Sequence, residues 1–550
     1  MRCNLSKAQG PLFSTPWFVF FFSCFLVFSL LFSCCLLFFL LLFFGFEDFF
    51  GAAYGLTGSV YGGLARSELG VNEPLFLRPD YWIQFLWKRT VGLNVLNVTS
   101  NNANLRTYGF SGPPPSSFAA GECGAGEGGE GGEGGYTLIL INLQRSSDVT
   151  VQFPSAVGRS TYSAWVVSPP NNDPFSPNVL LNNKPLPQVV DVNNGKSDFL
   201  SNIPGTAVSA SIQKGIVVPA SSIAFVCVQP IDLKMPLSNS NFNSNSKEAS
   251  LQINKKIGQT NPNYASFNID SSFNRGFFHM NFSNPNLRAA AKSLAPSTVR
   301  FGGTGNDYLH YDCETIPGQD NDLYGCLNDT HRADLLGLAS TSGNDFLWGL
   351  SFDMCQACAV NDSSYVWSPK DAIFLMSKMK TAKQSVWGFE LGNEVNNREK
   401  GGNDDCNLLP KQQSQAILEL GNVLREQFPI ASERPKQVGP DTGYHDAPNW
   451  LNQTLSNVAE SSTPNLLHAV THHVYPGIKR NNYNDPERLN QILAGDVKWY
   501  GPIVEKFAPN AQLWAGEDGP AGGGESGTCS GTAGDPHNIS ACGLYATTLW

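Results

Sequence analysis

SVWGFELGNEVNN, residues 385–397, decides the fold. An apolar strand runs here into Asn393 and Glu394, and polar side chains at the carboxyl end of a strand are typical of the active sites of (β/α) barrels. Similar strand-like runs alternate with helical stretches through the second half of the chain: STVRFGG at 297–303, DFLWGLSF at 345–352, KQVGPD at 436–441 and LLHAVTHHVY at 466–475. This alternation predicts an α/β fold with a parallel (β/α)8 TIM barrel. A doubly wound sheet is the alternative, but no glycine-rich phosphate loop follows any of the strands.

A second glutamate follows an apolar strand in AQLWAGEDGPAGGG, residues 511–524. Retaining glycoside hydrolysis needs two carboxyl groups about 5 Å apart, one protonated and one ionised. Glu394 and Glu517 could supply them, and Asn393 could hold a sugar hydroxyl beside them. We expect burial and the charge of Glu517 to raise the pKa of Glu394. The competing interpretation is that such strand-end acids cap helices or form surface salt bridges.

The charge balance limits the partners of this chain. Lys and Arg total 36 against 46 Asp and Glu, which gives a formal charge of −10. No run of basic residues could neutralise a phosphate backbone or a heavily sulfated polymer. We therefore expect neither a nucleic-acid partner nor a heavily sulfated one.

The N-terminal region carries a membrane signal. An uncharged, Phe- and Leu-rich run extends from Trp17 to Phe44, longer than the roughly 20 residues that span a bilayer. Arg2 and Lys7 precede the run, so positive-inside reasoning predicts a signal anchor with a cytosolic stub and a luminal or extracellular catalytic domain. A cleaved signal peptide and translated non-coding sequence are the alternatives.

Cysteines and glycosylation sequons point to the secretory pathway. Nine of the 13 cysteines follow the apolar run, as disulfides in an oxidising compartment would require. Six sequons occur, at Asn97, Asn281, Asn328, Asn361, Asn452 and Asn538. Cys355 and Cys358 form a C-x-x-C pair without a second pair or spaced histidines, so we predict a structural role for them. We expect no cofactor and no metal site.

Composition divides the chain into five segments. Strand-like runs such as TLILINL predict a β-sandwich, the glycine-rich acidic tract at 121–135 predicts a loop, and Asn, Ser and Lys then predict a linker. The expected segments are a cytosolic stub and transmembrane helix at 1–45, the last barrel strand and helix at 46–105, the sandwich at 106–230, the linker at 231–263, and barrel strands one to seven at 264–550.

Several motifs resemble those of the heparanase-like β-glucuronidases, glycoside hydrolase family 79 of the retaining barrel clan. They stand in the order of that family: SFNIDSSF at 266–273, STVRFGGTGNDYL at 297–309, WGFELGNEVNN at 387–397, VGPDTG at 438–443, AVTHHVY at 469–475 and WAGEDGPAGGG at 514–524. The resemblance implies a retaining hydrolase of glucuronate-bearing polysaccharide or proteoglycan glycans.

The resemblance also implies roles for single residues. Glu394 matches the acid/base and Glu517 the nucleophile of the family. The remaining matches would bind substrate: Asp270, Thr304 and Asn393 would hold the sugar, His473 and Tyr475 would lie near the nucleophile, Gly523 and Gly524 would bind the glucuronate carboxylate, and Tyr54 would return to the site. Gly522 stands where the family has an aromatic residue. A buried structural role is the alternative for His473 and Tyr475. His472 and His473 could also be metal ligands, but no further His or Cys stands at ligand spacing, so we do not expect a metal site there.

The order of the segments differs from the family. Residues from about Phe49 to Gln229 resemble the C-terminal end of a heparanase, with LRPDYWIQFLWKRTVGLNVL as the last barrel helix, yet they come first. A circular permutation would let Phe43 to Ala53 supply the eighth strand. The alternative is a composite reading frame that joins two tandem genes. The competing function is a catalytically silent, membrane-anchored glycan-binding protein.

Overall fold

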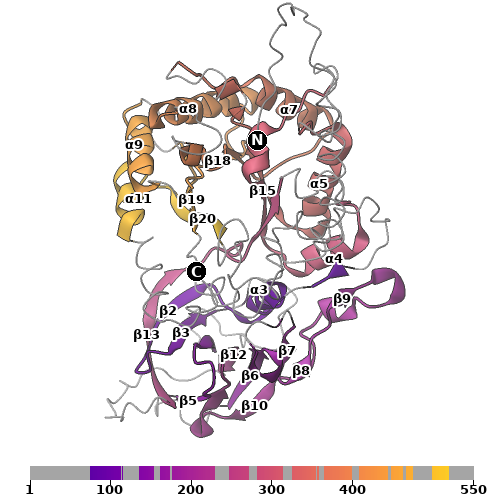
Figure 1. The fold of residues 1–550 in the computed structure, drawn as a ribbon, viewed down its shortest axis with the longest axis vertical. Helices are drawn as coiled ribbons and strands as arrows, with labels where there is room; N and C mark the ends of the chain where they lie inside the picture. The colour runs from indigo at the N-terminus through magenta and orange to yellow at the C-terminus, as the bar shows by residue number, and fades with distance from the viewer. Residues whose placement is uncertain are drawn as a thin grey trace, which may run out of the picture.

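The computed structural model shows two layers, a parallel sheet with its helices and an antiparallel sheet beside it (Figure 1). It describes residues 75–77, 79–112, 114, 135–153, 161–173, 176, 178–228, 247–271, 281–313, 325–354, 356–357, 364–398, 408–443, 447–461, 466–474 and 498–518. The expected anchor Trp17–Phe44 lies outside these ranges. Within the described ranges, no helix combines the length and the apolar character that a bilayer crossing requires.

Seven parallel strands carry the second half of the chain, and each pairs with the next in sequence. They are β14 (Phe267–Asp270), β15 (Thr298–Gly302), β16 (Asp345–Leu350), β17 (Gly388–Leu391), β18 (Lys436–Val438), β19 (Ala469–Val474) and β20 (Gln512–Asp518). Because every pairing is parallel, all seven carboxyl ends lie at one edge of the sheet. The candidate acids follow or end two of these strands, so the topology alone places them on the same side.

Helices alternate with these strands, which confirms the expected mixed α/β fold. They are α4 (Pro285–Ser293), α5 (Asp329–Ser342), α7 (Lys370–Thr381), α8 (Pro410–Gln427), α9 (Ala447–Ala459) and α11 (Gly501–Phe507). Local sequence sets their ends: the side chain of Asn284 accepts from two amides at the start of α4, and Asn328 does the same for α5. Gly343 ends α5 in the left-handed conformation that favours glycine.

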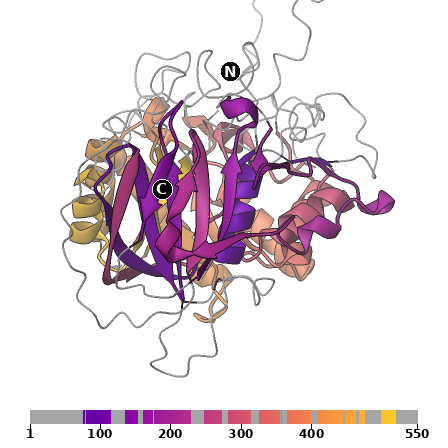
Figure 2. The same ribbon diagram turned by 90° about the horizontal axis from the view of Figure 1, so that it is seen from below.

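An eleven-stranded, mainly antiparallel sheet forms the other layer (Figure 2). Its strands are β2 (Asn94–Ser100), β3 (Leu105–Ser111), β4 (Tyr136–Asn142), β5 (Val149–Gln152), β6 (Thr161–Ser168), β7 (Leu180–Leu181), β8 (Lys184–Pro185), β10 (Val208–Ser211), β11 (Ile216–Val218), β12 (Ser222–Val228) and β13 (Glu248–Gln259), while β1 (Leu75–Phe76) pairs separately with β9 (Val189–Val190). Every residue of β4 is buried. Ile139 and Ile141 face the core shared with the parallel layer, and Leu138 and Leu140 face a second core.

The expected linker at 231–263 contains β13, a strand of 12 residues. It pairs antiparallel with β2 and parallel with β5, so residues 248–259 belong to the sheet. Ala249, Leu251 and Ile253 are buried at alternate positions. Composition hid this strand because polar residues occupy the positions between them. β2 likewise lies in the eleven-stranded sheet, although the expected barrel segment at 46–105 included it.

Helix α3 (Pro79–Thr90) joins the two layers, and Figure 1 shows it beside α4. The buried guanidinium of Arg89 donates to the carbonyl of Ser293 at the end of α4 and to that of Leu200 in the other layer, each at 2.8 Å. Tyr81 adds a hydrogen bond to the hydroxyl of Ser293. The helix that the sequence assigns to the end of the barrel thus packs against the first helix after β14.

Candidate active site

The chain turns sharply where β17 ends, and this turn presents Glu394. Gly392 and Glu394 both have positive φ angles, 79° and 50°. A left-handed conformation is uncommon for a residue with a side chain, and such residues gather at functional sites. The amide of Glu394 donates to the carbonyl of Asp441 at 2.9 Å, which fixes the turn against the loop after β18.

Glu394 and Glu517 meet at the carboxyl edge of the parallel sheet. A carboxylate oxygen of each, together with a ring nitrogen of His473, lies within 4.8 Å of the others. The two carboxylates remain partly open to solvent, with side chains 20% and 17% exposed. The structure therefore brings the three residues together from strands β17, β19 and β20.

His473 contacts both glutamates and Asp441. Its Nδ1 lies 2.8 Å from Glu394 and 3.4 Å from Glu517, and its Nε2 lies 2.7 Å from Asp441. Burial opposes a charged ring, but the negative charges of Asp441 and Glu517 and the hydrogen bonds to Asp441 and Glu394 outweigh it, so the pKa of His473 lies well above its ordinary value. The ring is therefore an imidazolium that donates from both nitrogens.

The pKa of Glu394 shifts in the direction opposite to our expectation. Burial favours the neutral acid, but the hydrogen bond and the charge of His473 outweigh it and hold the pKa of Glu394 below its usual range. The sequence-based prediction considered burial and Glu517 and did not foresee a cation at hydrogen-bond distance. Glu394 is thus ionised at neutral pH in this arrangement.

Arg300, on β15, contacts Glu517 and two buried carboxylates beside it. Its Nη1 donates to Glu517 at 3.0 Å, and its Nη2 donates to Asp441 at 2.6 Å. Its Nε donates to Glu390 at 2.6 Å. Three carboxylates surround a single guanidinium whose side chain is nearly inaccessible to solvent. Their charges outweigh the effect of burial and raise the pKa of Arg300, so it stays charged.

Asn393 and Gly303 fix the loop after β15 next to the acids. The side-chain oxygen of Asn393 accepts from the amide of Gly303 at 3.1 Å and from Arg300 at 3.3 Å. Gly303 has a φ of 93°, and a Cβ there would lie 2.5 Å from Oδ1 of Asp270, so only glycine fits. Thr304 begins the short 3-10 helix η10 (Thr304–Tyr308) directly after it. Asp270, Thr304 and Asn393 thus lie around one loop beside the acids.

Four of the predicted site residues lie outside the described ranges, namely Tyr54, Tyr475, Gly523 and Gly524. His472, which precedes His473 in the chain, packs its ring on that of Tyr500, with 4.3 Å between the ring centroids. Successive residues of a strand face opposite sides, so His472 points away from the acids that His473 contacts.

Glu394, His473 and Glu517 also have the composition of a metal site. A histidine binds a metal ion through an unprotonated nitrogen. The raised pKa of His473 places a proton on Nδ1, the nitrogen that faces the two glutamates. Protonation and metal binding therefore compete here, and the hydrogen-bonded arrangement favours the proton.

Residues 260–532 match the family "Glycosyl hydrolase family 79, N-terminal domain". Through these residues, the chain belongs to family 79. Heparanase-like protein 2 of Arabidopsis thaliana is 23% identical over 326 residues, which cover 51% of this chain and 56% of that protein. Heparanase of Rattus norvegicus is 23% identical over 317 residues, which cover 49% of this chain and 57% of that protein. The chain thus spans about half the length of the curated relatives it matches.

Among solved structures, the GH51 arabinofuranosidase from Xanthomonas axonopodis pv. citri is similar over 43% of this chain and 50% of that chain, with 15% identity and a TM-score of 0.32. The matched family region contains the described acids and the strands that hold them.

The cluster also contains residues that the sequence analysis did not single out: Arg300, Glu390, Asp441 and Thr471. Arg300 and Glu390 are charged residues inside otherwise apolar strands, and a charge on a buried strand needs a partner. That signal was present in STVRFGG and WGFEL. Which charge meets which depends on strand register, and the sequence does not specify that register.

Proposed function

We propose that this chain is a retaining glycoside hydrolase, with Glu517 as nucleophile and Glu394 as acid/base. One observation carries the proposal: an oxygen of each carboxylate lies within 4.8 Å of the other, at the same edge of a parallel sheet. Retaining enzymes separate their two carboxyl groups by about 5 Å, whereas inverting enzymes need room for a water molecule between sugar and base. Membership of family 79 supports the same chemistry.

The reaction proceeds in two steps. Glu517 attacks the anomeric carbon and forms an ester while the glycosidic bond breaks, and the leaving oxygen receives a proton from Glu394. Glu394, now ionised, then takes a proton from water as the water oxygen attacks the anomeric carbon and displaces Glu517. The contact of Arg300 with Glu517 supports an ionised nucleophile, because a guanidinium at 3.0 Å favours the carboxylate.

His473 supplies the proton that the resting Glu394 lacks. Ester formation removes the negative charge of Glu517, which is one of the charges that hold the proton on His473. As the ester forms, the proton moves along the 2.8 Å hydrogen bond from Nδ1 to Glu394 and on to the leaving oxygen. The neutral ring no longer lowers the pKa of Glu394, which makes Glu394 a stronger base in the second step, and the proton that it takes from water then returns to His473.

The substrate we propose is a glucuronate-bearing polysaccharide or proteoglycan glycan. The names of the relatives, heparanase and heparanase-like protein, support this class. The formal charge of −10 favours a glycan with less sulfate than heparan sulfate. The roles of Asp270, Thr304 and Asn393 in holding the sugar are part of the same proposal, as are those of the residues outside the described ranges.

We also propose a permuted (β/α)8 barrel with an accessory β-sandwich. The contact of α3 with α4 supports it, because the last helix of a barrel lies beside the first. The side chain of Asn268 on β14 donates to the carbonyl of Gly516 on β20 at 3.0 Å, so the first and last described strands of the parallel sheet approach each other. Membrane anchoring and a luminal or extracellular location remain predictions from the apolar run.

Turnover of an aryl β-glucuronide tests the function. We expect the purified chain to hydrolyse it and Glu517→Gln to abolish hydrolysis while circular dichroism stays unchanged. Glu394→Gln should slow the reaction by about 10²- to 10⁴-fold, the usual contribution of an acid/base. Full activity of Glu517→Gln would refute the assignment, and glycan binding without turnover would favour the silent glycan-binding protein.

A comparison of two polymers tests the substrate class. We expect faster cleavage of an unsulfated glucuronate-bearing polysaccharide than of heparan sulfate. A preference for the sulfated polymer would contradict the argument from charge.

Peptide mapping of the native protein would show whether residues 79–90 and 501–518 occur on one polypeptide, as the permuted barrel requires.

A further inference from the structure

Glu390 is a fully buried carboxylate that the reaction described above does not use. Glu390 lies on β17, the strand that leads to Glu394, and it has no solvent-exposed surface. A carboxylate without partners would be very costly at such a position. Its Oε2 accepts from Nε of Arg300 at 2.6 Å, and its Oε1 accepts from the hydroxyl of Thr471 at 2.8 Å.

These contacts belong to a closed ring of hydrogen bonds beneath the acids. The hydroxyl of Thr471 accepts from the amide of Asp441 at 3.0 Å. The side chain of Asp441 accepts from Nη2 of Arg300 at 2.6 Å, and Arg300 returns to Glu390 through Nε. The ring thus ties together β15, β17, β19 and the loop after β18. Nη1 of Arg300 is not part of this ring and contacts Glu517.

We propose that Glu390 is a positioning residue, which anchors Nε of Arg300 so that Nη1 holds Glu517 in place and keeps it ionised. This inference rests on the proposed function, because it assigns Glu390 to the same reaction. A guanidinium is planar, so fixing Nε and Nη2 also fixes the direction of Nη1. Without Glu390, Arg300 could turn within its pocket, and the orientation of the nucleophile would be lost.

The charged groups around Glu390 set its protonation. Arg300 faces it from β15 and Asp441 from the loop after β18, while Glu517 shares the same guanidinium. Burial and the charge of Asp441 raise the pKa of Glu390 to about 7 although Arg300 opposes them. Below about pH 7 this carboxyl group keeps its proton, so its influence on Glu517 comes from the position that it gives to Arg300.

Two substitutions alter this anchor in different ways. Glu390→Gln removes the charge and keeps the length of the side chain, whereas Glu390→Asp keeps the charge and shortens the side chain by one methylene. Asp191→Asn serves as a control, because Asp191 is another buried carboxylate and it accepts from Asn194 in the antiparallel layer. Circular dichroism and the unfolding midpoint show whether each variant is folded.

For Glu390→Gln, we expect kcat on an aryl β-glucuronide to fall by about 10²-fold, as for a misplaced reacting group, with KM changed by less than about threefold. The acid limb of the pH profile, which reports ionisation of the nucleophile, should move to higher pH, because a displaced guanidinium no longer favours the ionised form of Glu517. Glu390→Asp should lower kcat and move that limb in the same direction, since the shortened side chain also releases Nε of Arg300, and Asp191→Asn should match the wild type. Wild-type kcat and an unmoved acid limb in folded Glu390→Gln would overturn the inference.

A crystal structure of Glu390→Gln provides a readout that does not depend on turnover. We expect the contact between Nη1 of Arg300 and Glu517 to be lost or lengthened beyond hydrogen-bond distance. An unchanged contact would overturn the positioning role even if the wild type hydrolyses no glycoside. Absence of wild-type turnover would instead refute the proposed function, so the two failures can be told apart.

Discussion

Nδ1 of His473 lies 2.8 Å from Oε1 of Glu394, so a protonated imidazole holds the proposed acid/base. This contact reverses the pKa shift that burial alone would give to Glu394. In the first step of retention, the proton must come through His473. The neutral ring that remains no longer lowers the pKa of Glu394, so Glu394 is a stronger base when it takes a proton from water in the second step. The pair therefore behaves as one coupled acid, and its titration belongs to both residues.

Replacing His473 tests this coupling. In His473→Gln the charge that lowers the pKa of Glu394 is lost, so the pKa of Glu394 should rise. The alkaline limb of the pH profile of kcat/KM reports loss of the catalytic proton. In the wild type that limb reflects the raised pKa of His473, and in the variant it should reflect Glu394 alone and lie at lower pH. We also expect kcat to fall.

His468→Gln provides the matched control, because His468 precedes the same strand and contacts Trp387 and Trp514 instead of the acids. Its pH profile should equal that of the wild type. An alkaline limb that stays in place in His473→Gln would show that His473 does not hold the catalytic proton.

The raised pKa of Glu390 predicts how stability depends on pH. Between its ordinary value of 4.5 and about 7, the folded chain keeps the proton on Glu390, whereas the unfolded chain has released it. Stability therefore falls as pH rises through this window, by roughly 3 kcal/mol in total for this group. Glu390→Gln lacks the effect, so its unfolding free energy relative to the wild type should increase from pH 4.5 to pH 7.

Urea unfolding at several pH values measures this difference. Thr471→Val is the informative companion variant, since the hydroxyl of Thr471 donates to Glu390 and lowers its pKa. Without that hydroxyl, the loss of stability should continue to higher pH than in the wild type. Parallel pH curves for wild type and Glu390→Gln would contradict the prediction.

Much of this arrangement could be predicted from the sequence. The apolar strands that end at Glu394 and Glu517 follow directly from local patterns, and parallel pairing then places both acids at one edge. Asn393 stands in the same motif as Glu394, and His473 stands in a motif of its own, AVTHHVY at 469–475. The strand β13 was missed because its alternation of Ala249, Leu251 and Ile253 is interrupted by polar residues and continues into an exposed half.

The electrostatics of the site could not be predicted in the same way. The contacts of Arg300 with Glu390, Asp441 and Glu517 join four separate segments of the chain. Such contacts depend on the register of the parallel strands, which decides which inward-facing side chains lie next to each other. A shift of one residue would turn each side chain of a strand to the opposite face of the sheet. The pKa direction of Glu394 depends on these contacts, so the sequence alone gave the wrong sign.

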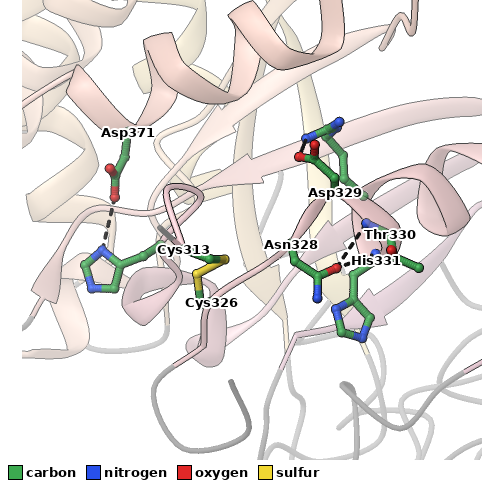
Figure 3. The surroundings of a disulfide bond; sticks show 9 residues. Cys313, Cys326, Asn328, Asp329, Thr330, His331 and Asp371 are labelled. Carbon is green, nitrogen blue, oxygen red and sulfur yellow. Dashed lines mark hydrogen bonds and ion pairs between the residues drawn. A yellow bond between two sulfur atoms is a disulfide. The ribbon is translucent and has the colours of Figure 1, made fainter. Parts of the chain in front are cut away.

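The disulfide between Cys313 and Cys326 should stabilise the chain measurably (Figure 3). It joins cysteines separated by 13 positions, and closing a loop of that length is worth about 3 kcal/mol in the chain-entropy model. The double variant Cys313→Ser with Cys326→Ser should therefore unfold at a clearly lower urea concentration. The ion pair of His310 with Asp371, at 3.1 Å, lies close to the disulfide, because the backbone of His310 pairs with that of Cys326.

Asp371→Asn is the control for this region, because it removes only that partly exposed ion pair. Such pairs contribute about 1 kcal/mol or less. The disulfide variant should thus be the more destabilised of the two. Equal unfolding midpoints for the double serine variant and the wild type would show that the disulfide adds nothing to stability.

Arg89 on α3 should be among the most sensitive positions for stability. Its guanidinium is buried, lies over the ring of Phe85 and donates to the carbonyls of Ser293 and Leu200. Arg89→Met would fill a similar volume and leave both carbonyls without these donors. Each buried group that loses its partner costs about 1–3 kcal/mol, so we expect a loss of several kcal/mol. Because Ser293 and Leu200 lie in different layers, the loss should affect the unfolding of both.

Lys184→Met is the matched control, since Lys184 is exposed on β8 and its replacement should change stability by about 0.5 kcal/mol or less. Thermal unfolding followed by near-ultraviolet circular dichroism would compare the two variants. If α3 joins the layers as its contacts indicate, Arg89→Met should lower the midpoint or split the transition into two, because each layer would lose its support from the other. An unchanged single transition would mean that the parallel layer is stable without α3, and the case for α3 as the last helix of a permuted barrel would then fail.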